Sequence, residues 1–134
     1  MNVKTFEEIM DRFRTIEFEE SFQLIVAIAN GGIIPAAILN QRLHCDLQLL
    51  KLHLRDDHQE QLYDEPRLLE PIQFNVTDKK LLLVEDRVKT GTTLNFAKQL
   101  LEKKGAAHVA TFAVNGKADY ALYDEPCFRF PWIS

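Results

Sequence analysis

The sequence predicts an α/β protein whose central sheet is mainly parallel and flanked by helices. Apolar segments of strand length, residues 24–29, 80–84 and 108–114, alternate with segments that repeat apolar residues at helical spacing. Strands connected through a helix pair in parallel by right-handed crossovers. Ligands of such sheets bind at the carboxyl ends of the strands. We therefore look for a binding site in the glycine-containing turns that follow two of these strands.

Each predicted helix has a recognisable start or end. The helix over residues 5–14 begins with a capping box, in which Thr5 is followed three positions later by a glutamate. Pro35 stands where a first-turn helical proline belongs. The helix over residues 92–104 is followed by Gly105, a typical C-terminal stop.

Two of the predicted strands are followed through to the segments that flank them: residues 24–29 and residues 46–54. Residues 24–29 form a continuous apolar run, which indicates a strand buried on both faces. Residues 46–54 predict a further strand, and residues 55–70 after it are polar and lack periodicity. Loops of this length are usually lids, binding loops or disordered, so this one favours an active site.

Length and charge limit the classes of function. A chain of 134 residues with 46% hydrophobic content predicts one domain, residues 1–134. The net charge of −4 provides no basic field for a nucleic-acid backbone. The N-terminus has no signal-peptide pattern, and no apolar run approaches the roughly 20 residues that span a bilayer. We expect a cytoplasmic protein without nucleic-acid or membrane partners.

The cysteines and histidines do not predict a metal or disulfide site. Cys45 and Cys127 belong to no Cys-x-x-Cys pair. The four histidines show no pairing at metal-ligand spacing on a helix.

Residues 81–94 carry the strongest functional signal. A buried strand is followed by Glu85 and Asp86 and then by a Thr/Gly turn, residues 90–93, that opens a helix. A phosphate group binds well where a helix N-terminus offers free amides, a glycine allows close approach and threonine hydroxyls add donors. This turn has all three features, so it is a candidate phosphate-binding turn. The carboxylates are suited to sugar hydroxyls or to a magnesium ion beside a pyrophosphate. The alternatives are a solvated acid pair and a simple helix cap.

This segment resembles the phosphoribosyl diphosphate (PRPP) signature of type I phosphoribosyltransferases: four hydrophobic residues, two acids and a Thr-Gly-x-Thr turn. The resemblance extends over roughly residues 24–132. It implies a single domain with the Rossmann-like fold of that family and a small C-terminal hood. It also implies that Glu85 and Asp86 contact the ribose and hold Mg²⁺, and that the 5-phosphate is wrapped by Lys89, Thr90, Gly91, Thr92 and Thr93. Catalytic roles would fall to Glu85, Asp86 and Lys89.

Residues 27–37 resemble the pyrophosphate loop of the same family. A strand there runs into Asn30, Gly31 and Gly32 and then into a helix. The resemblance implies that this turn binds the diphosphate and that the Ala29–Asn30 peptide bond is cis or otherwise strained. Asn30 stands where the family often has a basic residue. A plain turn is the alternative.

Two further features fall where the family has parts of its site. The loop over residues 55–70 matches the mobile catalytic loop, and Lys51, on the preceding strand, could reach the same cleft to bind PRPP. A solvated charge is the alternative for Lys51. The acids of the loop would repel a diphosphate unless Mg²⁺ or Arg67 offsets them.

The C-terminal segment, residues 128–134, resembles the base-binding hood of bacterial 6-oxopurine members. By this resemblance Phe128 stacks on the base, Trp132 belongs to the same site, and Lys117 reads the purine oxygen. An aromatic packing plug is the alternative. Lys89 replaces an aspartate of the purine members, and Ile133 replaces an acid, so phosphoribosyl binding is a firmer expectation than purine chemistry.

The resemblance implies a Mg²⁺-dependent phosphoribosyltransferase that binds PRPP or a nucleoside monophosphate. It would transfer the phosphoribosyl group to a nitrogenous base, with a purine as the first choice, and release pyrophosphate. We also expect a homodimer. The alternative is a catalytically weak relative that binds PRPP or a nucleotide as a sensor, which the departures at Asn30, Lys89 and Ile133 favour.

Overall fold

A six-stranded sheet forms the centre of the molecule, as predicted. The computed structural model describes residues 2–53 and 67–133, so most of the predicted loop 55–70 lies outside the described residues. The elements are, in chain order, β1 (Asn2–Val3), α1 (Phe6–Thr15), β2 (Leu24–Ala29), α2 (Ile33–Leu43), β3 (Asp46–His53), β4 (Arg67–Leu68), β5 (Lys80–Arg87), α3 (Thr92–Lys103), β6 (His108–Asn115), β7 (Tyr120–Tyr123) and β8 (Phe128–Arg129).

The sheet has the strand order β4-β3-β2-β5-β6-β7. All neighbours pair in parallel except β3 and β4. β2 and β5 are joined in register from Leu24 with Leu81 to Ala27 with Val84. The carboxyl ends of β2, β5 and β6 therefore meet at one edge, where the predicted turns lie.

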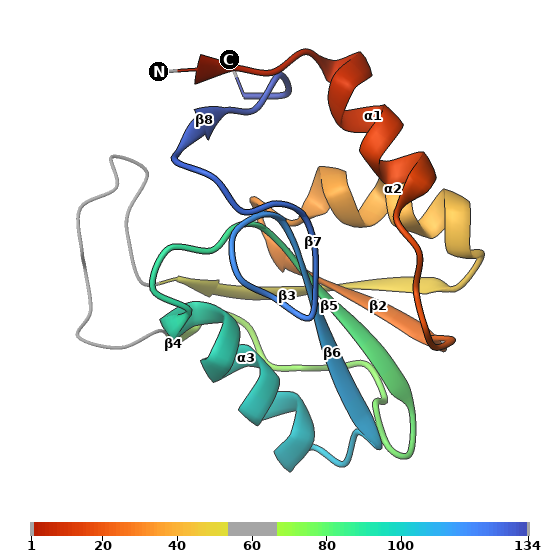
Figure 1. Cartoon of the computed structure of the whole chain (residues 1–134). Helices are drawn as coiled ribbons and strands as arrows, with labels where there is room; N and C mark the ends of the chain where they lie inside the picture. The colour runs from red at the N-terminus through yellow and green to blue at the C-terminus, as the bar shows by residue number, and fades with distance from the viewer. Residues whose placement is uncertain (1, 54–66, 134) are drawn as a thin grey trace.

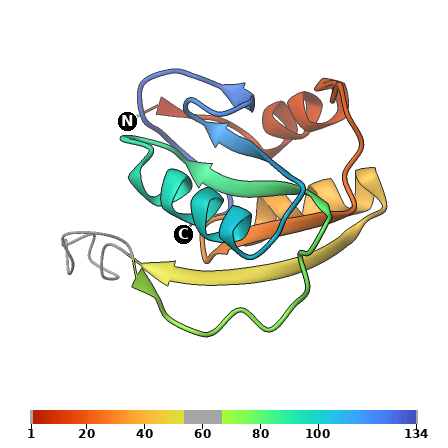
Figure 2. The same ribbon diagram turned by 90° about the horizontal axis from the view of Figure 1, so that it is seen from below.

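Helices cover both faces of the sheet (Figures 1 and 2). α1 and α2 lie on one side and α3 lies on the other. α1 begins as predicted, because the Thr5 hydroxyl accepts a hydrogen bond from the Glu8 amide at 3.1 Å. α3 ends before Gly105, whose φ of 104° suits glycine.

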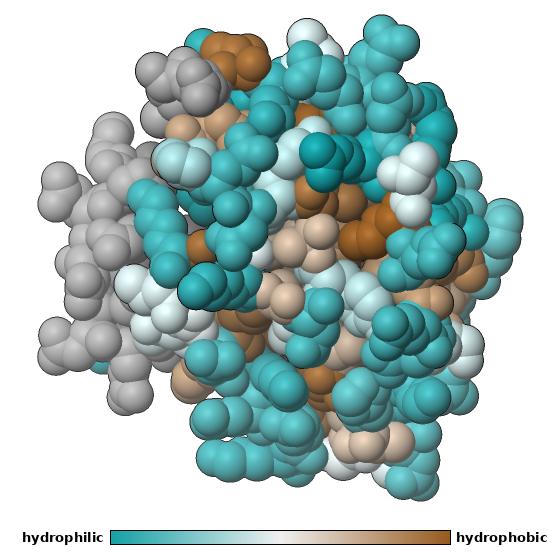
Figure 3. All heavy atoms as spheres, in the orientation of Figure 1, coloured by the Kyte–Doolittle hydropathy of each residue, from teal (hydrophilic) through white to brown (hydrophobic). Residues whose placement is uncertain are grey.

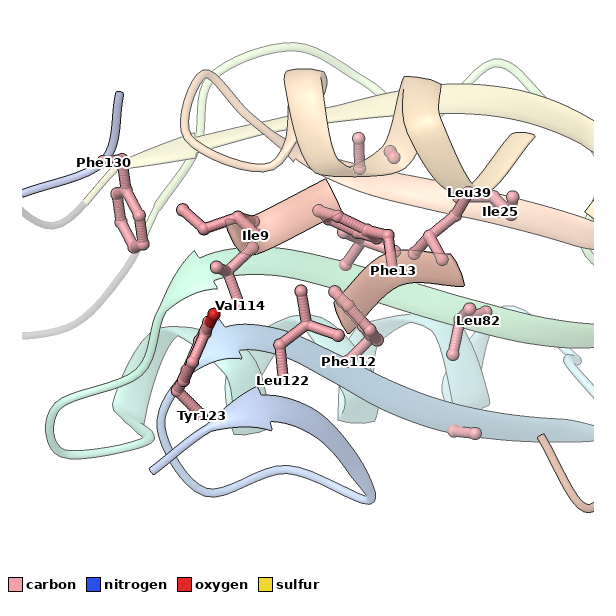
Figure 4. Packing of buried hydrophobic residues seen from close by; sticks show 14 of the residues in the cluster. Ile9, Phe13, Ile25, Leu39, Leu82, Phe112, Val114, Leu122, Tyr123 and Phe130 are labelled. Atoms are coloured by element: carbon pink, nitrogen blue, oxygen red, sulfur yellow. The ribbon is translucent and has the colours of Figure 1, made fainter. Parts of the chain in front are cut away.

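Alternating side chains of the buried strands supply two cores. On β5, Leu82 and Val84 face the cluster that includes α1 and α2, while Leu81 and Leu83 face the cluster that includes α3. Figure 4 shows the first cluster, where Phe13 of α1 points toward the sheet. The Phe13 and Phe112 rings stack at 5.8 Å between centroids.

A second, two-stranded sheet joins the two ends of the described chain. β1 pairs in parallel with β8, and this pair lies beyond the carboxyl edge of the main sheet (Figure 1). The Lys4 ammonium contacts a Glu125 carboxylate oxygen at 3.0 Å and lies 4.5 Å from the centroid of the Tyr123 ring. This small layer is the predicted C-terminal hood, but it also includes N-terminal residues, which the prediction missed.

Figure 3 shows hydrophilic residues around the edges of this face and weakly polar and apolar residues adjoining one another through its middle. Among the described residues, no helix has the length and apolar character needed to cross a membrane.

Candidate functional site

The acid pair lies at the carboxyl end of β5, where the strand leaves the core. Leu81 to Val84 are buried, and Glu85 and Asp86 are half-buried. Each carboxylate accepts a hydrogen bond from the next backbone amide: Glu85 Oε1 from Asp86 at 2.9 Å, and Asp86 Oδ1 from Arg87 at 2.6 Å. These bonds fix both carboxylates and leave oxygens for further partners.

The surroundings of Glu85 disfavour the charged form of its side chain. Burial raises the pKa of Glu85 well above its ordinary value, and the neighbouring Asp86 carboxylate raises it further. Among the described residues, no three His, Cys, Asp or Glu side chains gather closely enough to hold a metal ion by themselves. An acid pair of this kind fits Mg²⁺, which is commonly bound through one or two carboxylates together with phosphate oxygens of a substrate.

The turn after β2 lies directly against this acid pair. The Ala29–Asn30 peptide bond is cis, as the sequence analysis predicted. A Cβ atom on Gly31 would lie 2.7 Å from the carboxyl atoms of Asp86, so the Gly31 backbone and this carboxylate approach closely. Gly32 is packed against backbone, since a Cβ atom there would collide with the Val84 carbonyl oxygen. The structure therefore brings the predicted pyrophosphate turn and the acid pair together.

The Thr/Gly turn opens α3 as predicted. Gly91 is the N-cap with φ 85° and provides no side-chain cap. The Thr90 and Thr92 hydroxyls lie 3.0 Å apart, and the Thr92 amide donates to the Thr90 hydroxyl at 3.3 Å. Lys89 is exposed beside this turn, and Thr93 is half-buried. The turn combines free amides, hydroxyls and a cation at a helix N-terminus, which favours an anion.

Asn30 and Lys51 lie near the same edge. Lys51 pairs in register with Ala29, which places its backbone beside the turn. Its ammonium forms an exposed ion pair with Glu70 at 3.2 Å. Asn30 is exposed. The structure thus places Lys51 next to the site but pairs its charge with Glu70 rather than with the acid pair.

The predicted role of Phe128 as the base-stacking aromatic needs correction. Its side chain is 0% exposed, and both Tyr123 and Phe130 pack edge-on against its ring. No ring face remains for a base, so Phe128 is a packing residue.

Trp132 is half-buried and stacks on Phe130 with an interplanar angle of 4°. Lys117 is exposed directly after Gly116, at the carboxyl end of β6.

Sequence reasoning missed Arg87, which follows the acid pair. Its Nη2 donates to the Phe128 carbonyl oxygen, and its guanidinium lies 4.7 Å from the centroid of the Phe130 ring. Arg87 therefore links the acid pair to the hood. The charge at the end of an otherwise apolar strand was visible in the sequence, but its distant partners were not.

Comparisons with known proteins identify the family of the chain. The family described as "Phosphoribosyl transferase domain" matches residues 4–132. The chain is 27% identical over 119 residues to a xanthine-guanine phosphoribosyltransferase of Idiomarina loihiensis, covering 84% of this chain and 72% of that protein. It spans only 49% to 58% of the length of three further curated relatives.

Two solved structures share the fold. A purine phosphoribosyltransferase from Pyrococcus horikoshii superposes with a TM-score of 0.82 at 22% identity and covers 98% of this chain and 92% of its own. A hypothetical protein from Neisseria gonorrhoeae with bound ppGpp superposes with a TM-score of 0.74 at 18% identity and covers 99% and 89%.

The two glycines of the turn after β2 should differ in their tolerance of alanine. Gly32→Ala places a Cβ against backbone atoms, and we expect it to lower the free energy of unfolding by about 1–3 kcal/mol. Gly31→Ala meets only the Asp86 side chain, which can move aside by giving up its hydrogen bond from the Arg87 amide, and should cost less than Gly32→Ala, about 1 kcal/mol. Urea denaturation measures both, and equal losses would contradict the described packing.

Glu85→Gln should remove a pH dependence of stability. Between the ordinary glutamate pKa of about 4.3 and the raised value, the folded state holds a proton that the unfolded chain releases. The free energy of unfolding therefore falls as the pH rises through this range, and the loss is complete above it. We expect Glu85→Gln to be more stable than wild type above that range and nearly equal to it below. Thermal unfolding against pH, with the exposed Glu17→Gln as control, should show the change only at Glu85.

Proposed function

Because the chain belongs to the phosphoribosyl transferase domain family, we propose that it is a Mg²⁺-dependent phosphoribosyltransferase acting on PRPP. A nitrogen of the acceptor base forms the bond to C1 of the ribose, the bond from C1 to the diphosphate oxygen breaks, and pyrophosphate leaves. The observation that carries this proposal is the contact between Gly31 and the Asp86 carboxylate. This contact places the Asn30–Gly32 turn, which suits a diphosphate, next to the Glu85 and Asp86 carboxylates, which suit the hydroxyls of a ribose.

The residues have distinct roles in this proposal. Amides of the Asn30–Gly32 turn bind the diphosphate, and Lys51 adds a cation beside it once released from Glu70. Glu85 and Asp86 orient the ribose hydroxyls, and they are the residues that would hold Mg²⁺, which would offset the diphosphate charge. The 5-phosphate binds at the N-terminus of α3, with contacts from Lys89, Thr90, Gly91, Thr92 and Thr93. Positioning and fixed dipoles of this kind supply much of the catalysis in such transfers.

We propose a purine as the acceptor, with Lys117 and Trp132 on the side of the base. Two proteins similar to this chain support this choice, the xanthine-guanine enzyme of Idiomarina loihiensis and the purine enzyme of Pyrococcus horikoshii. A homodimer is part of the same proposal.

A second candidate is a sensor that binds PRPP or a nucleotide with little turnover. The observation that favours it is the exposed Lys89, a cation beside the phosphate turn where proton transfer from a purine needs an acceptor. The Neisseria gonorrhoeae protein with bound ppGpp supports nucleotide binding by this fold. Pyrophosphate release from PRPP and Mg²⁺ with a panel of bases separates the two candidates, because only the enzyme releases it at a base-dependent rate.

Gly91→Val should weaken binding of ribose 5-phosphate by at least about tenfold, or 1.4 kcal/mol. Valine rarely adopts the φ of 85° found at this position. Its side chain would also keep the 5-phosphate away from the backbone amides at the start of α3. Isothermal calorimetry gives the affinity. Gly105→Val is the matched control, because Gly105 also has positive φ but lies after α3, at its opposite end. Unchanged affinity in Gly91→Val would remove the phosphate assignment.

Lys89→Asp should raise turnover of purines by up to about 100-fold, the lower end of what general acid–base catalysis contributes. The substitution supplies a proton acceptor where wild type has a cation. Steady-state rates with guanine, xanthine and hypoxanthine measure the effect. Lys80→Asp makes the same charge change at the other end of β5 and should leave the rates unchanged. Fast wild-type turnover that the aspartate slows would contradict the assignment.

A further inference from the structure

Val88 stands in the short segment between the acid pair and the Thr/Gly turn. β5 ends at Arg87, and α3 begins at Thr92. Val88 itself belongs to neither element, so the regular hydrogen bonds of a strand or a helix do not set its position. The residues that hold Val88 therefore determine how far the Thr/Gly turn lies from the carboxylates.

The end of β6 holds Val88 in two ways. β5 and β6 lie side by side (Figure 1), with Arg87 and Asn115 paired in register. The Val88 amide donates a hydrogen bond to the Asn115 carbonyl oxygen at 2.9 Å. On the next residue, Gly116, a Cβ atom would lie 2.8 Å from the Val88 Cβ atom and would collide with the Val88 carbonyl oxygen. Val88 thus packs directly against the Gly116 backbone, in space that a side chain would occupy.

Asn115 and Gly116, which we call the β6 corner, are themselves fixed. The Asn115 side chain is 4% exposed. It donates to the Glu125 carbonyl oxygen at 3.1 Å and accepts from the Glu125 amide at 3.0 Å. The Gly116 amide donates to the Tyr123 carbonyl oxygen at 2.9 Å. Displacing a buried amide with both of its groups bonded is costly, so the β6 corner places Val88 and not the reverse.

The position of Val88 matters because the proposed ligand bridges two parts of the site. The ribose hydroxyls contact the acid pair, and the 5-phosphate contacts the Thr/Gly turn. Two contacts made by one molecule reinforce each other only when the protein groups stand at the matching distance. Inorganic phosphate needs the turn alone, so its affinity does not depend on that distance.

We propose that Gly116 is a positioning residue for phosphoribosyl binding. Together with Asn115 it sets the place of Val88, and through Val88 it sets the spacing between the acid pair and the Thr/Gly turn. A side chain at position 116 would displace Val88 and shift the turn relative to the carboxylates, while the amides and hydroxyls of the turn remain. This inference rests on the proposed function, which supplies the ligand that bridges the two parts.

The test compares ribose 5-phosphate with inorganic phosphate in wild type and in Gly116→Ala. Calorimetry gives the affinity for ribose 5-phosphate, and its displacement gives the affinity for inorganic phosphate. Wild type should bind ribose 5-phosphate at least about 100-fold more tightly, the lower end of the gain from linked contacts. Gly116→Ala should reduce this ratio at least about tenfold and change the affinity for inorganic phosphate less than about threefold.

Gly105→Ala is the matched control. Gly105 also has a positive φ, 104° against 137° for Gly116, so alanine strains the backbone at both positions. A Cβ atom on Gly105 meets nothing closer than the Thr77 hydroxyl oxygen at 3.5 Å. Gly105→Ala therefore displaces no neighbouring backbone and should keep the wild-type ratio.

Asn115→Asp takes the place of Gly116→Ala if the latter does not fold. An ionised aspartate still accepts from the Glu125 amide but cannot donate to the Glu125 carbonyl oxygen, so it loosens the β6 corner. The ratio should fall at least about threefold, in line with the loss of one hydrogen bond. Thr111→Val is the control, because Thr111 is the other buried polar side chain of the described residues and bonds to Asp119, earlier on β6.

Each outcome decides the inference. An unchanged ratio in the variant of the β6 corner, or equal weakening of both ligands, overturns it. A wild-type ratio near one also overturns it, because no bridging contact then exists to be positioned. If wild type binds ribose 5-phosphate and releases pyrophosphate from PRPP while the ratio stays unchanged in the variant, only the role of Gly116 falls. If wild type does not bind ribose 5-phosphate, the proposed function falls as well.

Discussion

The parallel pairing of β2 with β5 is the constraint on which the site depends. It aligns Ala27 with Val84, so the two strands end side by side and their following turns face each other. Gly32 is closed in by the Val84 and Ile28 carbonyl oxygens, and Gly31 stands against Asp86. Because Gly31 and Gly32 have no side chains, the turn after β2 can approach the Asp86 carboxylate, although Asp86 is distant in the sequence.

Much of this arrangement could be predicted from local patterns. The apolar runs predicted the buried strands, and the capping box and Gly105 predicted the limits of two helices. The acid pair and the Thr/Gly turn lie within ten residues of each other, so their relation follows from chain connectivity alone. The cis bond before Gly31 was predicted from the family resemblance and not from the physics of the turn.

The hood could not be predicted in the same way. Its strands β1 and β8 have two residues each, too few to show a periodicity, and their partners lie at opposite ends of the sequence. Phe128 was assigned to a base from its position in a segment that resembles the hood of the family, but Tyr123 and Phe130 enclose its ring. Arg87 was missed because its significance comes from contacts with Phe128 and Phe130 that only the folded chain creates.

The alternation of side chains along β5 limits how the chain can change in length. Leu82 and Val84 face one core, Leu81 and Leu83 face the other, and Asp86 continues the first series toward Gly31. Deleting or inserting one residue within this strand would exchange the two faces and carry the Asp86 carboxylate away from Gly31. Insertions and deletions among homologues should therefore be confined to the connections between strands, while the spacing from Leu81 to Gly91 stays constant.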